Sequence, residues 1–108
     1  MPVYNKLVRD KILEFIESEG LAYDARILES NELLSEVKEK MIEEAKEFRA
    51  AKTVNESVEE LADVLELLHT ALNVFGVTYE ELEEVRQQKK ENRGGFEKAI
   101  YLLNVEDN

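Results

Sequence analysis

The sequence predicts an all-α fold, a helical bundle of about four helices with at most a small β accessory near the C-terminus. Apolar residues recur at helical spacing along most of the chain, which is the primary signal of amphipathic helices. One proline and four glycines leave little chemistry for tight turns, so long helices are favoured. With 108 residues and no linker or internal repeat, the chain is predicted to form a single domain over residues 1–108.

The first two expected helices are separated by a glycine stop. The first runs from about Leu7 to Glu19 and ends at Gly20, because glycine readily takes the left-handed conformation found at helix C-termini. The second begins at Ser30 or Asn31, residue types that cap helices, and reaches about Ala51. Its apolar stripe has a clean helical period, which predicts that one face packs on the core.

The third expected helix is the most apolar segment of the chain. It opens at Ser57, where Ser57-x-x-Glu60 fits a capping box, and it ends at Gly76. Because it is apolar on most of its circumference, it is expected to be the central and most buried helix. A fourth helix is expected from Thr78, which starts a second capping-box pattern, to about Asn92.

The C-terminal tail has a different composition. The segment FEKAIYLLNV, residues 96–105, is rich in residues that favour strands, so a short strand is expected there, beside Ala25–Leu28. Phe96 and Tyr79 are expected in the core rather than as surfaces on which a base could stack.

Composition and charge exclude several classes of function. The net charge of −11 argues against a general nucleic-acid binder, which needs a basic surface to neutralise phosphates. The absence of cysteine excludes disulfides, zinc thiolate sites and thiol nucleophiles, and a single histidine argues against a histidine-based metal site. There is neither an apolar run of about 18 residues nor a signal-peptide pattern, so a soluble, cytoplasmic protein without membrane contact is expected.

Four acidic residues fall where a helix would bury them. Glu44 and Glu47 lie one turn apart on the second expected helix, and Glu60 and Asp63 lie one turn apart on the third. Burying an unpaired carboxylate is costly unless it takes up a proton or finds a cation. If the two helices are antiparallel, the pairs face each other, and hard divalent cations such as Mg²⁺ or Mn²⁺ would relieve their repulsion. This joint arrangement favours a metal site that leaves room for phosphate ligands.

Each acidic residue also has an ordinary explanation. A glutamate on a surface helix is usually a solvated charge, and Glu60 is explained by helix capping alone. Glu43 and Glu47 could pair across a helical turn with Lys46 or Lys40. For a single residue these explanations are the more common ones, and only the set of four favours metal binding.

Basic residues gather in two clusters. NKLVRDK contains Lys6 and Arg9, and RQQKKENR contains Lys89 and Arg93. The clusters could be plain electrostatic compensation in an acidic chain or, in the second case, cations that favour a helix C-terminus. The functional alternative is a clamp for polyphosphate opposite the metal ions, in which these four residues contact the phosphates.

The acidic residues also form a motif. Glu43-Glu44-x-x-Glu47, followed after twelve residues by Glu60-x-x-Asp63, resembles the EExxE…ExxD signature of the all-α nucleoside triphosphate pyrophosphatases. These are the MazG-like proteins, related to dimeric dUTPases and to phosphoribosyl-ATP pyrophosphohydrolase. The opening YNKLVRDKI and the late RGGFEK are similar to one subgroup, short single-domain proteins predicted to hydrolyse non-standard nucleotides. The chain departs from that subgroup after KI, where it has Leu13 and the subgroup usually has proline.

The resemblance implies a Mg²⁺-dependent enzyme, with Mn²⁺ as an alternative ion. It implies that Glu44, Glu47, Glu60 and Asp63 are the metal ligands, and that Glu43 supports them. Glu47 and Glu44 are the expected catalytic pair, in which Glu47 orients the attacking water or accepts its proton. The resemblance also implies a homodimer or a higher homo-oligomer, because members of the family complete their helical bundle with a second subunit.

The expected function is therefore hydrolysis of a nucleoside triphosphate to the monophosphate and pyrophosphate, as house-cleaning of non-standard nucleotides. Two alternatives stay open. An enzyme of the same fold could act on phosphoribosyl-ATP, although the KLVRDKI opening weighs against this substrate. A non-catalytic helical dimerisation module is the alternative from another class, and it would leave the inward carboxylates unexplained.

Overall fold

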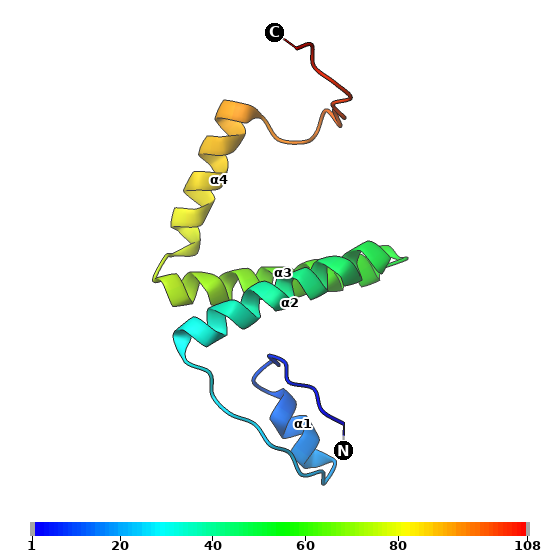
Figure 1. Ribbon diagram of the computed structural model, residues 1–108, viewed down its shortest axis with the longest axis vertical. Helices are drawn as coiled ribbons and strands as arrows, with labels where there is room; N and C mark the ends of the chain where they lie inside the picture. Colours follow the sequence, from blue (N-terminus) through cyan, green and yellow to red (C-terminus); the bar gives the residue numbers. More distant parts are fainter. Residues whose placement is uncertain (1, 108) are drawn as a thin grey trace. The chain divides into compact units, whose positions relative to one another are not determined.

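The computed structural model describes residues 2–107 and confirms the all-α prediction (Figure 1). Its helices are α1 (Ile12–Ser18), α2 (Ser30–Ala50), α3 (Val54–Phe75) and α4 (Tyr79–Arg93), and no strand occurs between residues 2 and 107. Within the same range, no single helix has both the length and the apolar composition of a membrane span, although the consecutive pair α3 and α4 passes that test when taken together.

The chain divides into two compact units. The first extends to Gly76 and contains α1, α2 and α3, whereas the second starts at Val77 and contains α4 and the C-terminal tail. The acidic motif lies entirely in the first unit, and the RGGFEK segment lies entirely in the second. The single domain that the sequence predicts over residues 1–108 stays a prediction.

The first unit is organised by the pairing of α2 with α3. A short connection at residues 51–53 reverses the chain, so the two helices run antiparallel and lie side by side (Figure 1). Their shared core is small and centres on Val37 of α2, which is fully buried, with Leu67 and Leu72 of α3 at 7% and 9% exposure. This is the antiparallel arrangement needed for the two pairs of carboxylates to face each other.

The start of α3 differs from the prediction in a way that affects the site. The helix begins at Val54, one turn before Ser57, because Thr53 caps it: the Glu56 backbone N–H donates to Thr53 Oγ1 at 3.1 Å. The Glu56 carboxylate in turn accepts from the Lys52 backbone N–H at 3.0 Å. The predicted capping box at Ser57 and Glu60 is therefore wrong, since the N-terminal N–H groups are already satisfied one turn earlier.

The other helix ends follow the sequence more closely. Gly76 ends α3 with a left-handed backbone at φ 70°, and Gly20 follows α1 at φ 72°. Thr78 caps α4, because its side chain accepts from the Glu81 N–H at 3.1 Å, as predicted.

The first helix is shorter than predicted, because it begins at Ile12 rather than at Leu7. Asn5 has a positive φ of 45°, and the chain enters the helix through a turn in which the Ile12 N–H donates to the Arg9 carbonyl at 3.1 Å. The segment before the turn contacts α2 and α3 instead of forming helix: Lys6 and Leu7 line a hollow with α2, and Arg9 pairs with α3. Tertiary contacts thus override the local helical pattern here.

The β accessory predicted for the tail is wrong. Residues 96–98 form a turn, and neither residues 25–28 nor residues 99–105 have strand structure. A strand requires a partner backbone, and in this structure Ile100 and Tyr101 are 80% and 87% exposed. Phe96 is 97% exposed, so its predicted place in the core is also wrong.

The apolar surface of α3 is only partly covered within this chain. Leu67 and Leu72 are buried, but a stripe at i, i+4, i+7 and i+11 in the first half of α3 is exposed. That stripe consists of Val54, Val58, Leu61 and Leu65, which are 79%, 57%, 49% and 45% exposed. Within residues 2–107, α3 is therefore not enclosed on all sides as the sequence predicts for a central helix.

Candidate metal centre

The pairing of α2 with α3 brings three of the predicted ligands together. Glu44 and Glu47 of α2 and Glu60 of α3 each offer a carboxylate oxygen, and these oxygens all lie within 4.8 Å of one another. The cluster is graded from core to surface: Glu44 is buried at 6% exposure, Glu60 is half-buried and Glu47 is exposed. A ligand could therefore reach the cluster from the side of Glu47.

Two atoms of this cluster are buried without a hydrogen-bond partner. Among the residues that the structure describes, Glu44 Oε2 and Glu60 Oε2 lack any partner. Leaving a buried polar atom unsatisfied costs about 1–3 kcal/mol, and more when the group is charged. These unsatisfied oxygens distinguish the cluster from an ordinary acidic helix surface, because a cation would satisfy them.

Burial and mutual repulsion make the carboxylates of this cluster difficult to ionise. Burial raises the pKa of Glu44 to about 8 from its usual 4.5, and the neighbouring carboxyls of Glu60 and Glu47, with the charge of Asp63, add to the shift. The interaction with Glu44 lowers the pKa of Glu60, but desolvation, Glu47 and Asp63 outweigh it, so this pKa is raised as well. Where no cation is bound, protons on these carboxyl groups reduce the repulsion between them. A divalent ion would compete with the protons for the carboxylate oxygens.

Asp63 lies beside the cluster rather than in it. Its Oδ1 accepts a hydrogen bond from Arg9 Nη2 at 2.6 Å, with the two side chains 37% and 57% exposed. The bond joins the KLVRDKI segment to α3 across 54 positions of sequence. Sequence reasoning singled out both residues but missed their contact, since no local pattern links positions this far apart. The prediction that Asp63 is a metal ligand stays a prediction.

Glu43 belongs to a neighbouring hollow. Its carboxylate lies 3.9 Å from Lys40 Nζ, one of the pairings expected for an ordinary surface glutamate. Glu43 and Lys40 line a hollow of about 390 Å³ together with Lys46 and with Lys6 of the N-terminal segment. Lys6 Nζ also lies 5.9 Å from the centre of the Tyr4 ring. Glu43 thus lies outside the trio of Glu44, Glu47 and Glu60, and its supporting role stays a prediction.

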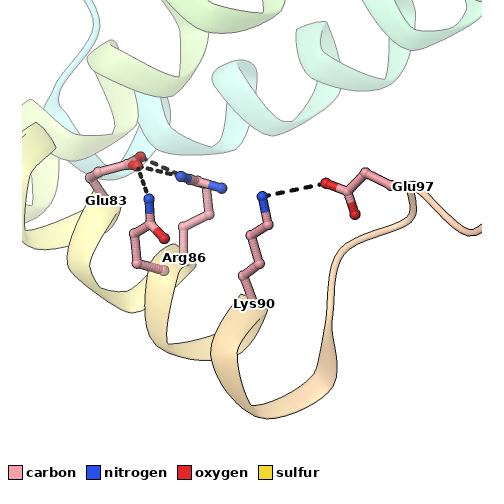
Figure 2. Close-up of polar contacts among 5 residues, drawn as sticks. Glu83, Arg86, Lys90 and Glu97 are labelled. Atoms are coloured by element: carbon pink, nitrogen blue, oxygen red, sulfur yellow. Dashed lines mark hydrogen bonds and ion pairs between the residues drawn. The ribbon is translucent and has the colours of Figure 1, made fainter.

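The remaining two predicted phosphate contacts lie in the second unit. Lys89 and Arg93 line a hollow of about 780 Å³ at the C-terminal end of α4, together with Arg86 and Lys90. Arg86 is held by Glu83, to which its Nε donates at 2.9 Å, and Lys90 Nζ lies 3.3 Å from Glu97 (Figure 2). The first basic cluster of the sequence therefore belongs to the first unit, and the second basic cluster belongs to the second unit.

A comparison with known families decides the affiliation. A family model described as phosphoribosyl-ATP pyrophosphohydrolase matches residues 17–90, a range that holds all four predicted carboxylate ligands. The chain belongs to the phosphoribosyl-ATP pyrophosphohydrolase family. This pyrophosphohydrolase is thus a member of the MazG-like all-α superfamily, whose enzymes hydrolyse phosphoric anhydride bonds. No curated protein and no solved structure gives a significant match.

The matched range also separates the two kinds of candidate site residue. It contains the whole carboxylate motif and Lys89, but it excludes Lys6, Arg9 and Arg93. The carboxylate cluster thus belongs to the part of the chain that is shared with the family, whereas most of the candidate phosphate contacts lie outside that part.

Proposed function

We propose that this pyrophosphohydrolase converts nucleoside triphosphates to nucleoside monophosphates and pyrophosphate with the help of Mg²⁺ or Mn²⁺, and that it removes non-standard nucleotides. The observation that carries the proposal is the pair of buried, unsatisfied oxygens of Glu44 and Glu60, in a chain whose family hydrolyses phosphoric anhydrides. Such a pair is costly to an enzyme that has no cation to place there.

The donor set fits a hard divalent ion. Glu44, Glu47 and Glu60 supply carboxylate oxygens from two facing helices, the ligand type that Mg²⁺ and Mn²⁺ prefer. Asp63 can add a fourth carboxylate once Arg9 no longer occupies its oxygen. When bound, the ion supplies positive charge that neutralises phosphate oxygens and makes the attacking water more acidic.

The protein's own side chains divide the remaining tasks. Glu47 is the exposed member of the trio, so it is placed to orient the attacking water and to accept its proton. Glu44 is buried and would bind the ion from the side of the protein core. Arg9 has an exposed guanidinium next to Asp63 and can exchange that carboxylate for a phosphate oxygen of the substrate. Lys6, Lys89 and Arg93 are further proposed phosphate contacts.

The proposed enzyme is a homodimer or a higher homo-oligomer in the cytoplasm. The exposed apolar stripe of α3, from Val54 to Leu65, supports self-association, because a stable soluble protein covers a continuous apolar helix face. A second copy that lays its own α2–α3 pair on this stripe would complete a four-helix core.

Phosphoribosyl-ATP is the second candidate substrate, and the family match over residues 17–90 favours it. Hydrolysis of either substrate class releases pyrophosphate, so the product alone does not distinguish them. The two classes are distinguished by their values of kcat/KM. The enzyme should be tested with phosphoribosyl-ATP beside standard and modified nucleoside triphosphates under the same conditions. A kcat/KM for phosphoribosyl-ATP above that for every triphosphate would reverse the choice between the two.

The experiment that tests the proposal measures products and their dependence on the cluster. With Mg²⁺, the chain should release pyrophosphate and monophosphate, and in ¹⁸O-labelled water the label should enter the monophosphate. Glu60→Gln should lower kcat by about 100-fold or more, the scale for removing a group that stabilises charge in the transition state. Glu59→Gln is the matched control, because Glu59 is the exposed neighbour on α3 and lies outside the carboxylate trio. Release of orthophosphate and nucleoside diphosphate would contradict the proposal.

A further inference from the structure

The C-terminal tail, residues 99–105, is an apolar segment that the rest of the described chain leaves uncovered. Six of its seven residues are apolar. Its large apolar side chains are between 72% and 87% exposed, and they are Ile100, Tyr101, Leu102, Leu103 and Val105. A soluble protein rarely leaves a contiguous apolar surface open, and a surface of this kind commonly marks an interaction site. The tail is therefore a candidate for contact with another chain.

The backbone of the tail is unpaired as well as its side chains. Figure 1 shows the tail after α4 without helix or strand, and within residues 2–107 the backbone N–H groups of residues 100–105 donate no backbone hydrogen bond. Ala99 has a positive φ of 52°, so the segment available for pairing begins at Ile100. Ile, Tyr and Val are residue types that strands favour, and a strand requires a partner backbone. A second extended segment would satisfy the backbone groups and cover the side chains at once.

The charges at the two ends of the tail indicate which segment that is. Lys98 precedes the apolar residues, and Glu106 and Asp107 follow them. Glu97 is engaged by Lys90 at 3.3 Å, whereas Lys98 has no ion-pair partner among residues 2–107. The tail is thus positive where it begins and negative where it ends. Two copies in antiparallel orientation bring these opposite charges together, whereas a parallel pair would bring like charges together. The tail is therefore complementary to a second copy of itself.

The order of residues in the tail also selects a register. In a two-fold symmetric antiparallel pair, one residue lies on the symmetry axis and faces its own copy. With Leu102 on the axis, Ile100 faces Asn104, and Glu106 lies at the end where the other copy has Lys98. With Leu103 on the axis, Ile100 would instead face the carboxylate of Glu106, which has no partner there. Charge and polarity therefore favour the register centred on Leu102.

The same register gathers apolar side chains on one face of the pair. Successive residues of a strand point to opposite faces, so Tyr101, Leu103 and Val105 of both copies share a face. A two-stranded pair is only marginally stable in water by itself. In an assembly that already holds two copies together, the effective concentration of one tail for the other reaches roughly the millimolar range. The pairing is therefore expected within a homo-oligomer rather than between free chains.

We propose that residues 100–104 of two copies pair as an antiparallel β-ribbon centred on Leu102, and that this ribbon links subunits of the homo-oligomer. The inference rests on the self-association given under the proposed function and not on the hydrolytic activity. The ribbon is a second contact between copies, separate from the exposed stripe of α3. It gives the strand-forming composition of the tail a role that the single chain does not fulfil, since no strand occurs between residues 2 and 107.

The direct test uses the absence of cysteine from the chain. Leu102→Cys places one thiol on the symmetry axis, where the facing Cα atoms are about 4.5–5.5 Å apart, a separation that a disulfide can span. Asn104→Cys is the matched control, because its two copies are offset by roughly 13 Å along the strands, too far for a disulfide. Under mild oxidation, Leu102→Cys should form a covalent dimer about tenfold faster or more than Asn104→Cys. Equal rates for the two variants would overturn the proposal, because two mobile tails would react in this way.

Charge reversal tests the antiparallel orientation. In the Leu102→Cys background, Lys98→Glu should slow disulfide formation by about threefold or more, because it places like charges at both ends of the ribbon. Addition of Glu106→Lys to the same chain should restore the rate, since the charges are then opposite again. Lys38→Glu is the matched control, because it makes the same change of charge at an exposed position of α2, and it should leave the rate unchanged. A rate that Glu106→Lys does not restore would contradict the antiparallel pairing.

Hydrogen exchange of the unmodified chain tests the ribbon without cysteine. Alternate amides of residues 100–104 should be protected, and the protection should decrease on dilution as the assembly dissociates. Exchange of all these amides at the rate of an unstructured chain would overturn the proposal. Protection without rapid disulfide formation in Leu102→Cys would mean that the tail packs on a different surface, which also overturns the ribbon.

These outcomes are distinct from a failure of the proposed function. If sedimentation shows a homo-oligomer but Leu102→Cys reacts no faster than Asn104→Cys, the ribbon is wrong and the self-association stands. If the wild-type chain is a monomer, the proposed homo-oligomer and the ribbon are both wrong. If Leu102→Cys forms the covalent dimer but no triphosphate is hydrolysed with Mg²⁺, the ribbon stands and the proposed reaction is wrong.

Discussion

Replacing Glu44 with glutamine should stabilise the metal-free protein while it abolishes turnover. Glu44→Gln keeps the shape of the side chain and removes its ability to ionise. In the wild-type protein Glu44 is 6% exposed, lies beside Glu47 and Glu60, and has one oxygen without a partner among the described residues. Deprotonating it in the absence of a cation places a charge in a site that repels it.

The sign and size of the effect follow from the pKa of Glu44. Its pKa in the folded protein is raised to about 8 from the usual 4.5. A raised pKa means that the folded state binds the proton more tightly, so the associated stability is fully present below about pH 4.5 and is lost as the pH rises to about 8. Each pH unit in this interval lowers the free energy of unfolding by about 1.4 kcal/mol, so the total loss is on the order of a few kcal/mol. Glu44 and Glu60 titrate as a coupled pair, so the loss belongs to both residues together.

The loss of stability can be measured by urea unfolding in EDTA at two pH values. About pH 5 and about pH 8.5 enclose most of the interval in which Glu44 gives up its proton. The wild-type protein should lose stability between the two pH values, and Glu44→Gln should lose less, so that the variant is the more stable protein at the higher pH. Glu59→Gln, an exposed glutamate on α3, should follow the wild type. The reasoning is refuted if wild type and Glu44→Gln change in parallel, or if Glu44→Gln unfolds more easily at the higher pH.

Three further predictions address the metal, the helix cap and the exposed stripe of α3. Millimolar Mg²⁺ should raise the calorimetric Tm of the wild type, with about 2.7 kcal/mol of stabilisation at about 100 times the dissociation constant, and should leave the Tm of Glu44→Gln unchanged. Thr53→Ala should cost about 1 kcal/mol of stability in urea unfolding, because it removes the cap of α3, whereas a larger loss in Ser57→Ala would favour the capping box that the sequence predicted. Val58→Asp, on the exposed stripe, should shift the protein to monomer in sedimentation experiments, and an unchanged oligomeric state would exclude this stripe as the interface.

Those parts of the structure that depend on local patterns could be predicted from the sequence. The helical periods, the cap at Thr78 and the stop at Gly76 each involve residues within about one turn, and each was confirmed. The facing of Glu44 and Glu60 was predictable as well, since an apolar period places them on the inner sides of two consecutive helices.

The parts that failed depend on contacts between distant residues. The KLVRDKI segment has a helical pattern, but Lys6 and Leu7 line a hollow with α2 and Arg9 pairs with Asp63, so the helix starts only at Ile12. Phe96 was expected in the core because a phenylalanine side chain favours burial, but it opens the turn that follows Gly94 and Gly95 and is 97% exposed. Neither outcome could be read from neighbouring positions alone.

The position of the α3 cap is what makes the carboxylate cluster possible. If Ser57 opened the helix, Glu60 would turn back to the N-terminal N–H groups, and its carboxylate would be satisfied by the backbone. Thr53 and Glu56 satisfy those groups one turn earlier, so Glu60 is left inside the helix with its side chain toward Glu44. Its Oε2 then lacks a partner among the described residues, which costs stability that a proton or a bound cation can restore. One glutamate can therefore be a cap or a metal ligand, and the residue at which the helix begins decides between the two roles.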